Sequence, residues 1–188
     1  MVRERRGRRI LGAVAIFLTA IALQQACTRP WGQGAGPDGS RYELSVVGLS
    51  RSAPGGSLPR TDCRWWPRYG DATLCGARAG GEAAYGRLRL AYPLLQVALW
   101  LAVASLLLQT LRVPRHRLWQ GAAPAAVSAM TITGILFVMR AAQQGLGALD
   151  QVTIQFGSRG FVLAVVAALL SAFSAIVAFT PEPSASDR

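Results

Sequence analysis

Four long apolar runs alternate with polar stretches along the chain. They cover residues 10–27, 90–111, 122–139 and 160–180, and none of them contains Asp, Glu, Lys or Arg. A helix needs about 20 residues, within a range of about 17–25, to cross the ~30 Å hydrocarbon core of a bilayer. All four runs fit this range, whereas a soluble protein of this size would have to bury four charge-free helices. The pattern therefore predicts four transmembrane helices.

Arginines gather beside these runs. Residues 1–9 and 112–121 are short and basic, and short basic segments next to membrane spans stay in the cytoplasm. This predicts that the N-terminus, the 112–121 loop and the tail 181–188 are cytoplasmic, and that residues 28–89 and 140–159 are extracytoplasmic. The 28–89 loop also contains arginines, but long loops cross largely regardless of charge. We expect a multi-pass protein of the cell (inner or plasma) membrane, whose basic cytoplasmic rim attracts anionic lipid headgroups.

The first run also resembles a cleavable signal peptide, because a basic start precedes an apolar core that ends near Ala26. A cleavage site needs a small residue where this chain has Gln24, and the same Gln24 argues against lipid attachment at Cys27. We therefore expect residues 10–27 to remain as an uncleaved helix, with Cys27 as a small apolar residue at its end.

The 28–89 loop carries the signals of a small β-sheet. After a Gly-rich stretch that indicates turns, residues 42–46 alternate apolar and polar side chains, which is typical of a strand with one covered face. Gly and Pro residues then break the chain, and we expect further strands near 64–66 and 73–75. The predicted fold class is an all-α membrane protein, a four-transmembrane-helix bundle with a small extracytoplasmic β-sheet in its first outward loop.

Cys63 and Cys75 lie together in this outward loop, where thiols oxidise readily. A hairpin through residues 67–71 would bring their Cα atoms within the ~7 Å that a disulfide allows. Closing so short a loop restricts the unfolded chain by roughly 3 kcal/mol in the entropic account. We expect these two cysteines to bond to each other and Cys27 to stay unpaired; the alternative is that both loop cysteines are unpaired and structural.

Aromatic and arginine residues fill the segment between the two loop cysteines. Trp65, Trp66, Arg68 and Tyr69 favour either a core for the small sheet or a contact surface for a partner or the membrane interface. Trp and Tyr are common in both settings, so both interpretations stay open.

Small residues recur at four-residue spacing in the last two runs. This spacing lets helix backbones approach closely, and helices in lipid associate largely through such packing. The predicted packing positions are Gly134, Gly160, Ala164, Ala168 and Ala172.

The charge and the motifs of the sequence reduce the number of possible functions. The net charge of +11 is carried by arginine without any lysine, and its position beside the apolar runs favours lipid headgroups over nucleic acid. Carboxylates and histidines inside a membrane mark proton relays, ion pathways and cofactor ligands, and the four runs contain none. His116, the single histidine, lies in a predicted cytoplasmic loop, and the sequence has no C-x-x-C pair, P-loop or G-x-S-x-G motif. We therefore expect no enzyme activity, no cofactor and no metal site.

Several features of the layout occur together. Trp31 follows the first predicted helix closely, Cys63 and Cys75 lie late in the long outward loop, and residues 156–161 (Phe-Gly-Ser-Arg-Gly-Phe) lead into the fourth helix. With both ends inside, this layout resembles the claudin superfamily, which includes peripheral-myelin-like and channel-regulating tetraspan proteins. The Gly-Leu-Trp that usually precedes the first cysteine of that group is absent here. The resemblance implies a left-handed four-helix bundle capped by an extracellular sheet, with adhesive, barrier-forming or partner-regulating roles.

The leading hypothesis is a non-catalytic accessory or scaffold subunit that packs against other integral membrane proteins through its small-residue helix faces and its outward loop. A second hypothesis is a small channel or transporter formed when identical chains associate around the helix of Gln96 and Gln109. We expect these two amides to bond to neighbouring helices rather than to line a pore. A third hypothesis is claudin-like adhesion or receptor regulation through the outward loop.

Overall fold

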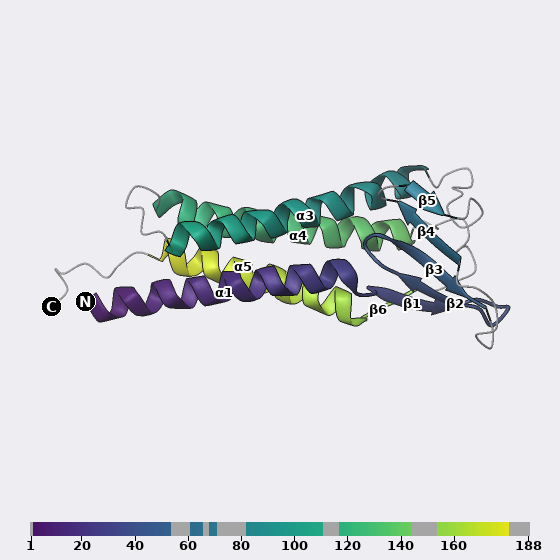
Figure 1. The fold of residues 1–188 in the computed structure, drawn as a ribbon, viewed down its shortest axis with the longest axis horizontal. Coiled ribbons are helices and arrows are strands. Elements are labelled where there is room, and N and C mark those ends of the chain that lie inside the picture. Colours follow the sequence, from purple (N-terminus) through teal and green to yellow (C-terminus); the bar gives the residue numbers. More distant parts are fainter. Residues whose placement is uncertain are drawn as a thin grey trace.

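The computed structural model describes the backbone of residues 2–53, 61–65, 68–70, 82–110, 117–143 and 154–180. Within these residues, four helices form an antiparallel bundle, and a small sheet covers one end of it (Figure 1). The helices are α1 (Val2–Thr28), α3 (Glu82–Thr110), α4 (Arg117–Gln143) and α5 (Arg159–Phe179). The strands are β1 (Gly32–Ala35), β2 (Arg41–Leu44), β3 (Gly48–Ser52), β4 (Thr61–Trp65), β5 (Arg68–Gly70) and β6 (Gln155–Phe156).

Each of these helices holds a stretch long and apolar enough to cross a membrane. The stretches are Ile10–Thr28, Gly86–Gln109, Gly121–Gln143 and Arg159–Phe179. The prediction of four such helices is confirmed, and by the length and composition of its helices the chain is a multi-pass membrane protein. Three helices begin at least five residues before the apolar runs, at Val2, Glu82 and Arg117. Arginine and glutamate favour helix formation, but they are charged and so do not belong to an apolar run. Hydropathy alone therefore places these helix starts too late.

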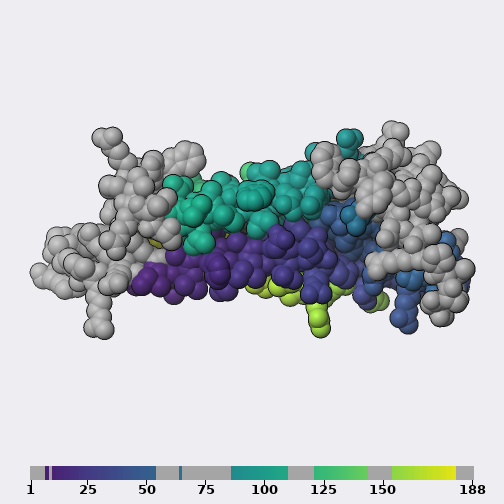
Figure 2. Space-filling model, viewed as in Figure 1, coloured from purple at the N-terminus to yellow at the C-terminus, as the bar shows by residue number. Residues whose placement is uncertain are grey.

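The helices pack in a closed ring, in which α1 and α4 each contact both α3 and α5. Small residues fill the interior: the buried alanines of the helices include Ala15, Ala22, Ala98, Ala102, Ala123, Ala164, Ala167, Ala168 and Ala175. Large side chains such as Ile16, Leu23 and Leu95 are buried with them. Other large apolar side chains point outward, and Trp100, Leu169 and Ile176 are 69%, 66% and 64% exposed. Figure 2 shows the continuous surface that α1 and α3 form along the bundle. This distribution fits helices that face lipid, where close packing of small residues holds helices together.

The sheet is antiparallel throughout, with the strand order β5-β4-β3-β2-β1-β6. Strands β1 to β5 follow one another along the chain after α1. β6 comes directly before α5 and pairs with β1, with Gly32 opposite Phe156. The segment that leaves α1 and the segment that enters α5 therefore meet in one sheet.

Two of the expected strands have counterparts in this sheet. The strand expected at 42–46 corresponds to β2, and the one expected near 64–66 corresponds to β4. The strand expected near 73–75 lies outside the described residues. The Gly-rich stretch predicted to form turns contains β1, because strand pairing uses backbone groups that glycine also has. β3 and β6 had no predicted counterpart; β6 has two residues, too few for an alternating pattern to be recognised.

The hairpin expected through residues 67–71 is wrong in its register. β4 and β5 pair with Trp65 opposite Arg68 and with Cys63 opposite Gly70, so the chain reverses between Trp65 and Arg68. The only residues between them are Trp66 and Pro67. The residues 68–70 that the expected hairpin placed in the turn instead form strand β5.

Candidate functional site

Trp31 lies where the bundle meets the sheet, and it is completely buried. Its indole Nε1–H donates to the carbonyl of Ala26 in α1 at 2.7 Å, and its backbone N–H donates to the carbonyl of Leu44 in β2 at 2.7 Å. Its ring meets Phe161 of α5 edge to face, with 6.2 Å between the centroids. One side chain, both buried and hydrogen-bonded, thus connects α1, the sheet and α5.

Gly160 brings α5 against the segment that leaves α1. Its N–H donates to the carbonyl of Pro30 at 2.9 Å. A Cβ at this position would stand 2.6 Å from the carbonyl oxygen of Arg29 and 2.7 Å from that of Pro30, closer than real Cβ atoms come to backbone. The four-residue spacing predicted Gly160 as a helix-packing position, but these neighbours belong to the linker between α1 and β1. Only glycine allows this approach without a shift of backbone.

β6, which comes directly before α5, also belongs to this junction. Phe156 packs against Phe161 with 5.6 Å between the ring centroids, and Gly157 has a φ of +134° between β6 and α5. At Gly32 in β1, a Cβ would stand 2.5 Å from Cγ2 of Ile154, so the chain segments at this edge lie very close. Trp31 belongs to one hydrophobic core that runs from the bundle into the sheet. Sheet and bundle are therefore packed as one unit.

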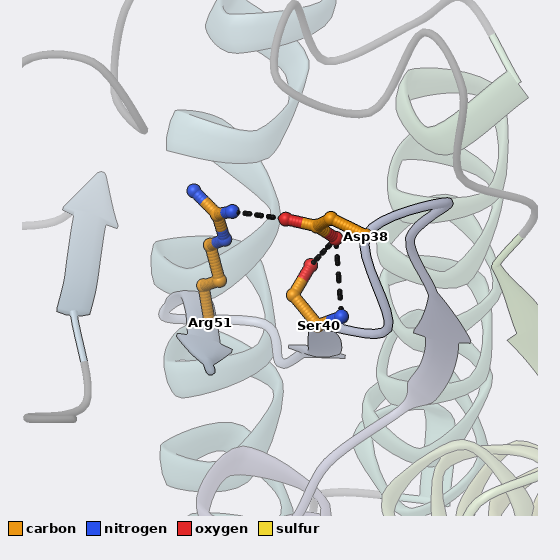
Figure 3. Close-up of polar contacts among 3 residues, drawn as sticks. All are labelled: Asp38, Ser40 and Arg51. Carbon is orange, nitrogen blue, oxygen red and sulfur yellow. Dashed lines mark hydrogen bonds and ion pairs between the residues drawn. The ribbon is translucent and has the colours of Figure 1, made fainter. Parts of the chain in front are cut away.

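The far tip of the sheet is closed by a polar cluster of Asp38, Ser40 and Arg51 (Figure 3). The Asp38 carboxylate accepts the Ser40 backbone N–H at 3.1 Å, accepts the Ser40 hydroxyl, and forms an ion pair with the Arg51 guanidinium. The hydrogen bonds from Ser40, aided by Arg51, lower the pKa of Asp38 to about 2. Arg51 also lies over the Tyr42 ring at 5.8 Å from its centroid. A carboxylate held ionised in this way stabilises the β1–β2 turn and is a poor proton donor.

The two faces of the sheet differ in character. Tyr42, Leu44 and Leu49 are buried in the same core as the bundle residues. On the opposite face, Gln33 and Arg41 are exposed. Ser50, on the same face opposite Glu43, is buried. The exposed polar part of this face, at Gln33 and Arg41, is the candidate contact surface of this protein.

The bundle interior contains hydroxyl groups that bond to backbone carbonyls. Ser128 of α4 donates to Ala168 of α5 at 3.0 Å, and Ser174 of α5 donates to Gly12 of α1 at 3.2 Å. Three further buried hydroxyls bond to carbonyls of their own helices: those of Thr19, Thr131 and Ser171. Since these groups are satisfied by protein, they need no water, and two of the bonds connect neighbouring helices.

The two glutamines of α3 also point into the bundle. The Gln96 amide lies beside the thiol of Cys27 in α1. Gln109 donates to the Ser105 hydroxyl of its own helix at 3.5 Å and lies close to Gly12 of α1. Both glutamine side chains are only partly exposed.

The predicted packing positions lie in different surroundings. A Cβ at Gly134 of α4 would stand 3.2 Å from the Leu95 side chain of α3. Ala164 and Ala168 of α5 are buried, whereas Ala172 is partly exposed. Sequence reasoning missed Gly121, where a Cβ would stand 2.5 Å from the Phe179 ring. Gly121 lies one residue before the predicted third span, so it was not among the small residues whose spacing within the spans predicted packing.

The cysteines and the aromatic segment are only partly described. Cys27 has a free thiol and is buried. Cys63 lies in β4 with Leu49 and Gly70 as its cross-strand neighbours, while Cys75 and Trp66 lie outside the described residues. The structure gives the strands of Trp65, Arg68 and Tyr69 but not their side-chain positions. The Cys63–Cys75 bond and the contact role of this aromatic segment therefore stay predictions.

Among the described residues, no three His, Cys, Asp or Glu side chains gather as a metal site requires. No protein-family model matches the chain, and no curated protein resembles it significantly in sequence. The resemblance to the claudin superfamily stays a prediction, and the function has to be argued from the geometry.

Proposed function

We propose that the chain is a non-catalytic accessory or scaffold subunit of a larger membrane assembly, which presents its sheet at a set position on the extracytoplasmic side of the membrane. The junction of Trp31 and Gly160 supports this most, because there the sheet and two helices share one core. A scaffold must hold its contact surface in one orientation. A sheet packed onto a bundle of membrane-spanning helices meets that need.

The direction of α1 supports the orientation. α1 begins at the end of the bundle away from the sheet (Figure 1). With the basic residues 1–9 in the cytoplasm, the sheet stands on the other side of the membrane. The assembly partners would then be other integral membrane proteins, with anionic lipid at the basic cytoplasmic rim.

An oligomeric channel around α3 has weaker support. Gln96 lies beside Cys27 of α1, and Gln109 lies close to Gly12, so these amides are engaged within the chain. The face that α3 turns outward is apolar instead, and its exposed large side chains are Leu90, Val97, Trp100 and Leu107. A pore built by identical chains around this face would lack a polar lining.

Adhesion or receptor regulation of the claudin-like kind is the second candidate, and the exposed polar face of the sheet favours it. Gln33 and Arg41 on that face are open to contact from outside the membrane. The two candidates differ in where the partner lies. A scaffold binds a protein of the same membrane, whereas an adhesion module binds a component across the extracytoplasmic space.

Gentle detergent extraction from native membranes, followed by sizing and mass spectrometry, tests the scaffold proposal. We expect the chain to elute in a complex with at least one other integral membrane protein. A lone, monodisperse monomer without a co-purifying protein would contradict the proposal. Recovery of a soluble or envelope component instead would favour adhesion.

A matched pair of glycine substitutions tests whether the position of the sheet matters. Gly160→Ala forces the linker after α1 away from α5, since its Cβ meets backbone at 2.6 Å, whereas Gly86→Ala adds a Cβ with nothing within 4 Å. We expect Gly160→Ala to lose the partner and Gly86→Ala to keep it. Retention of the partner by both variants would mean that the set position of the sheet is not needed for assembly.

A further inference from the structure

Each helix of the bundle carries an exposed arginine near the end that faces the sheet. Arg29 directly follows α1, Arg89 lies in the first turns of α3, Arg140 in the last turn of α4, and Arg159 begins α5. We call these four residues the arginine collar.

Contacts between the helices place the collar residues at one level. The carbonyl of Arg29 meets the position of Gly160, so Arg29 and Arg159 are neighbours across the α1–α5 seam. Ser128 bonds to Ala168, and from that contact Arg140 and Arg159 each lie about three helical turns toward the sheet.

The α3–α4 contact gives the same result for the other two helices. Gly134 lies against Leu95, and Arg140 and Arg89 are equally far along their helices from this contact, in the direction of the sheet. Because a helix rises about 1.5 Å per residue, the collar residues differ in height by roughly one turn. The arginines thus surround the bundle at nearly the same height.

Apolar side chains begin directly on the membrane side of the collar. Leu90, Leu136 and Val162 lie within about one turn of collar arginines and are about half exposed. Such side chains belong in hydrocarbon, whereas guanidinium groups belong at the level of lipid headgroups. The collar therefore marks the boundary between the two zones on the sheet side of the membrane.

We propose that the arginine collar binds the phosphate groups of anionic phospholipids in the leaflet on the sheet side, and thereby sets the depth of the bundle. Guanidinium groups bind phosphate oxygens in paired hydrogen bonds, and the backbones of Arg29 and Arg159, both with exposed side chains, lie close together at one seam. A protein partner would cover one side of the bundle, while lipids surround all four helices. This proposal does not depend on the scaffold role.

Lipid titration of the full-length protein tests the collar. The protein in mild detergent is titrated with phosphatidylglycerol or phosphatidylcholine of the same acyl chains, and native mass spectrometry counts the bound lipids. We expect preference for phosphatidylglycerol, and we expect each arginine lost in R29Q/R159Q to weaken its binding by about fivefold. The preference should also decline as salt is raised.

The control variant is R41Q, which removes one exposed arginine from β2, away from the bundle. It should leave phosphatidylglycerol binding within about twofold of the wild type. Equal binding by R29Q/R159Q and the wild type, or an equal loss in R41Q, would overturn the proposal, as would equal affinity for both lipids. If R29Q/R159Q does not fold, R140Q gives the same test with a single arginine, and an unchanged affinity there overturns the proposal too.

Discussion

The bundle and the sheet satisfy their backbone hydrogen bonds in different ways. Each helix of the bundle bonds its own backbone, so a span depends on one stretch of about 20 neighbouring residues. Each strand of the sheet takes its partners from other segments, and β1 pairs with β6 from a distant part of the chain, with Gly32 opposite Phe156. The bundle can therefore be recognised segment by segment, whereas the sheet exists only once distant segments have met.

The bundle and the sheet also differ in which side chains they bury. The helices bury many alanines together with large side chains such as Ile16, Leu23 and Leu95 and turn further large apolar residues toward lipid, while the sheet buries Tyr42, Leu44 and Leu49 against the bundle. Trp31 joins the two arrangements, because it is a large side chain buried by both regions at once. We expect substitutions at this junction to cost far more stability than substitutions on the lipid-facing helix surface.

The largest expected effect is that of Trp31→Ala. Removing a fully buried aromatic side chain costs about 3–5 kcal/mol, and here the hydrogen bond to Ala26 is lost as well. The matched control is Trp100→Ala, whose side chain is 69% exposed and meets lipid or detergent in the folded state. Unfolding in mixed detergent micelles measures both. Equal destabilisation by the two variants would show that the junction is not a special point of the fold.

The second largest effect is expected from the cysteines of the sheet region. We predict that Cys63 and Cys75 are bonded, and that Cys63→Ser removes roughly 2–5 kcal/mol from the sheet region while the helices stay inserted. Peptide mapping without reducing agent identifies the bond directly. A cross-link that contains Cys27, or free thiols at both loop positions in oxidised membranes, would contradict this prediction.

A smaller effect is expected from a hydrogen bond inside the bundle. Ser128→Ala removes the bond between α4 and α5 and should cost about 0.6 kcal/mol, with roughly 1.7 kcal/mol as an upper value for such bonds. Thr133→Ala is the control, since the Thr133 hydroxyl bonds only to Ala129 of its own helix. The same unfolding assay compares them. A loss at Ser128 as large as that of Trp31→Ala would mean that polar bonds rather than packing hold the bundle.

The smallest expected effect is the pH dependence of the sheet tip. The pKa of Asp38 is lowered from 3.8 to about 2, so its ionised form stabilises the folded tip above pH 3.8, and this stabilisation is lost as the pH falls through about 2. The effect is small because Asp38 is exposed to solvent. Proteolysis of the β1–β2 turn by an acid-stable protease at pH 4 and pH 2 measures it. Asp38→Asn should remove the difference between the two pH values, and an unchanged difference would assign it to other groups.

The candidate site shows which structural features can be predicted from patterns among neighbouring residues. Alternation revealed β2, but β1 is too rich in glycine and β6 too short to show the same signal. Four-residue spacing drew attention to Gly160 for packing between helices, whereas its closest contact is the carbonyl of Arg29 in a linker. Spacing within one helix shows which of its faces is lined by small residues, but it does not show which segment packs against that face.

Hydropathy along consecutive residues was enough to establish the four spans, because the bilayer acts on each apolar stretch independently. The folded chain alone determined that Trp31 is buried between α1, β2 and α5. It also determined that β6 joins β1 and that arginines from four helices stand at one level. Each of these relations joins residues far apart in the chain, and such contacts form only when the closing of long loops is repaid by packing at the junction.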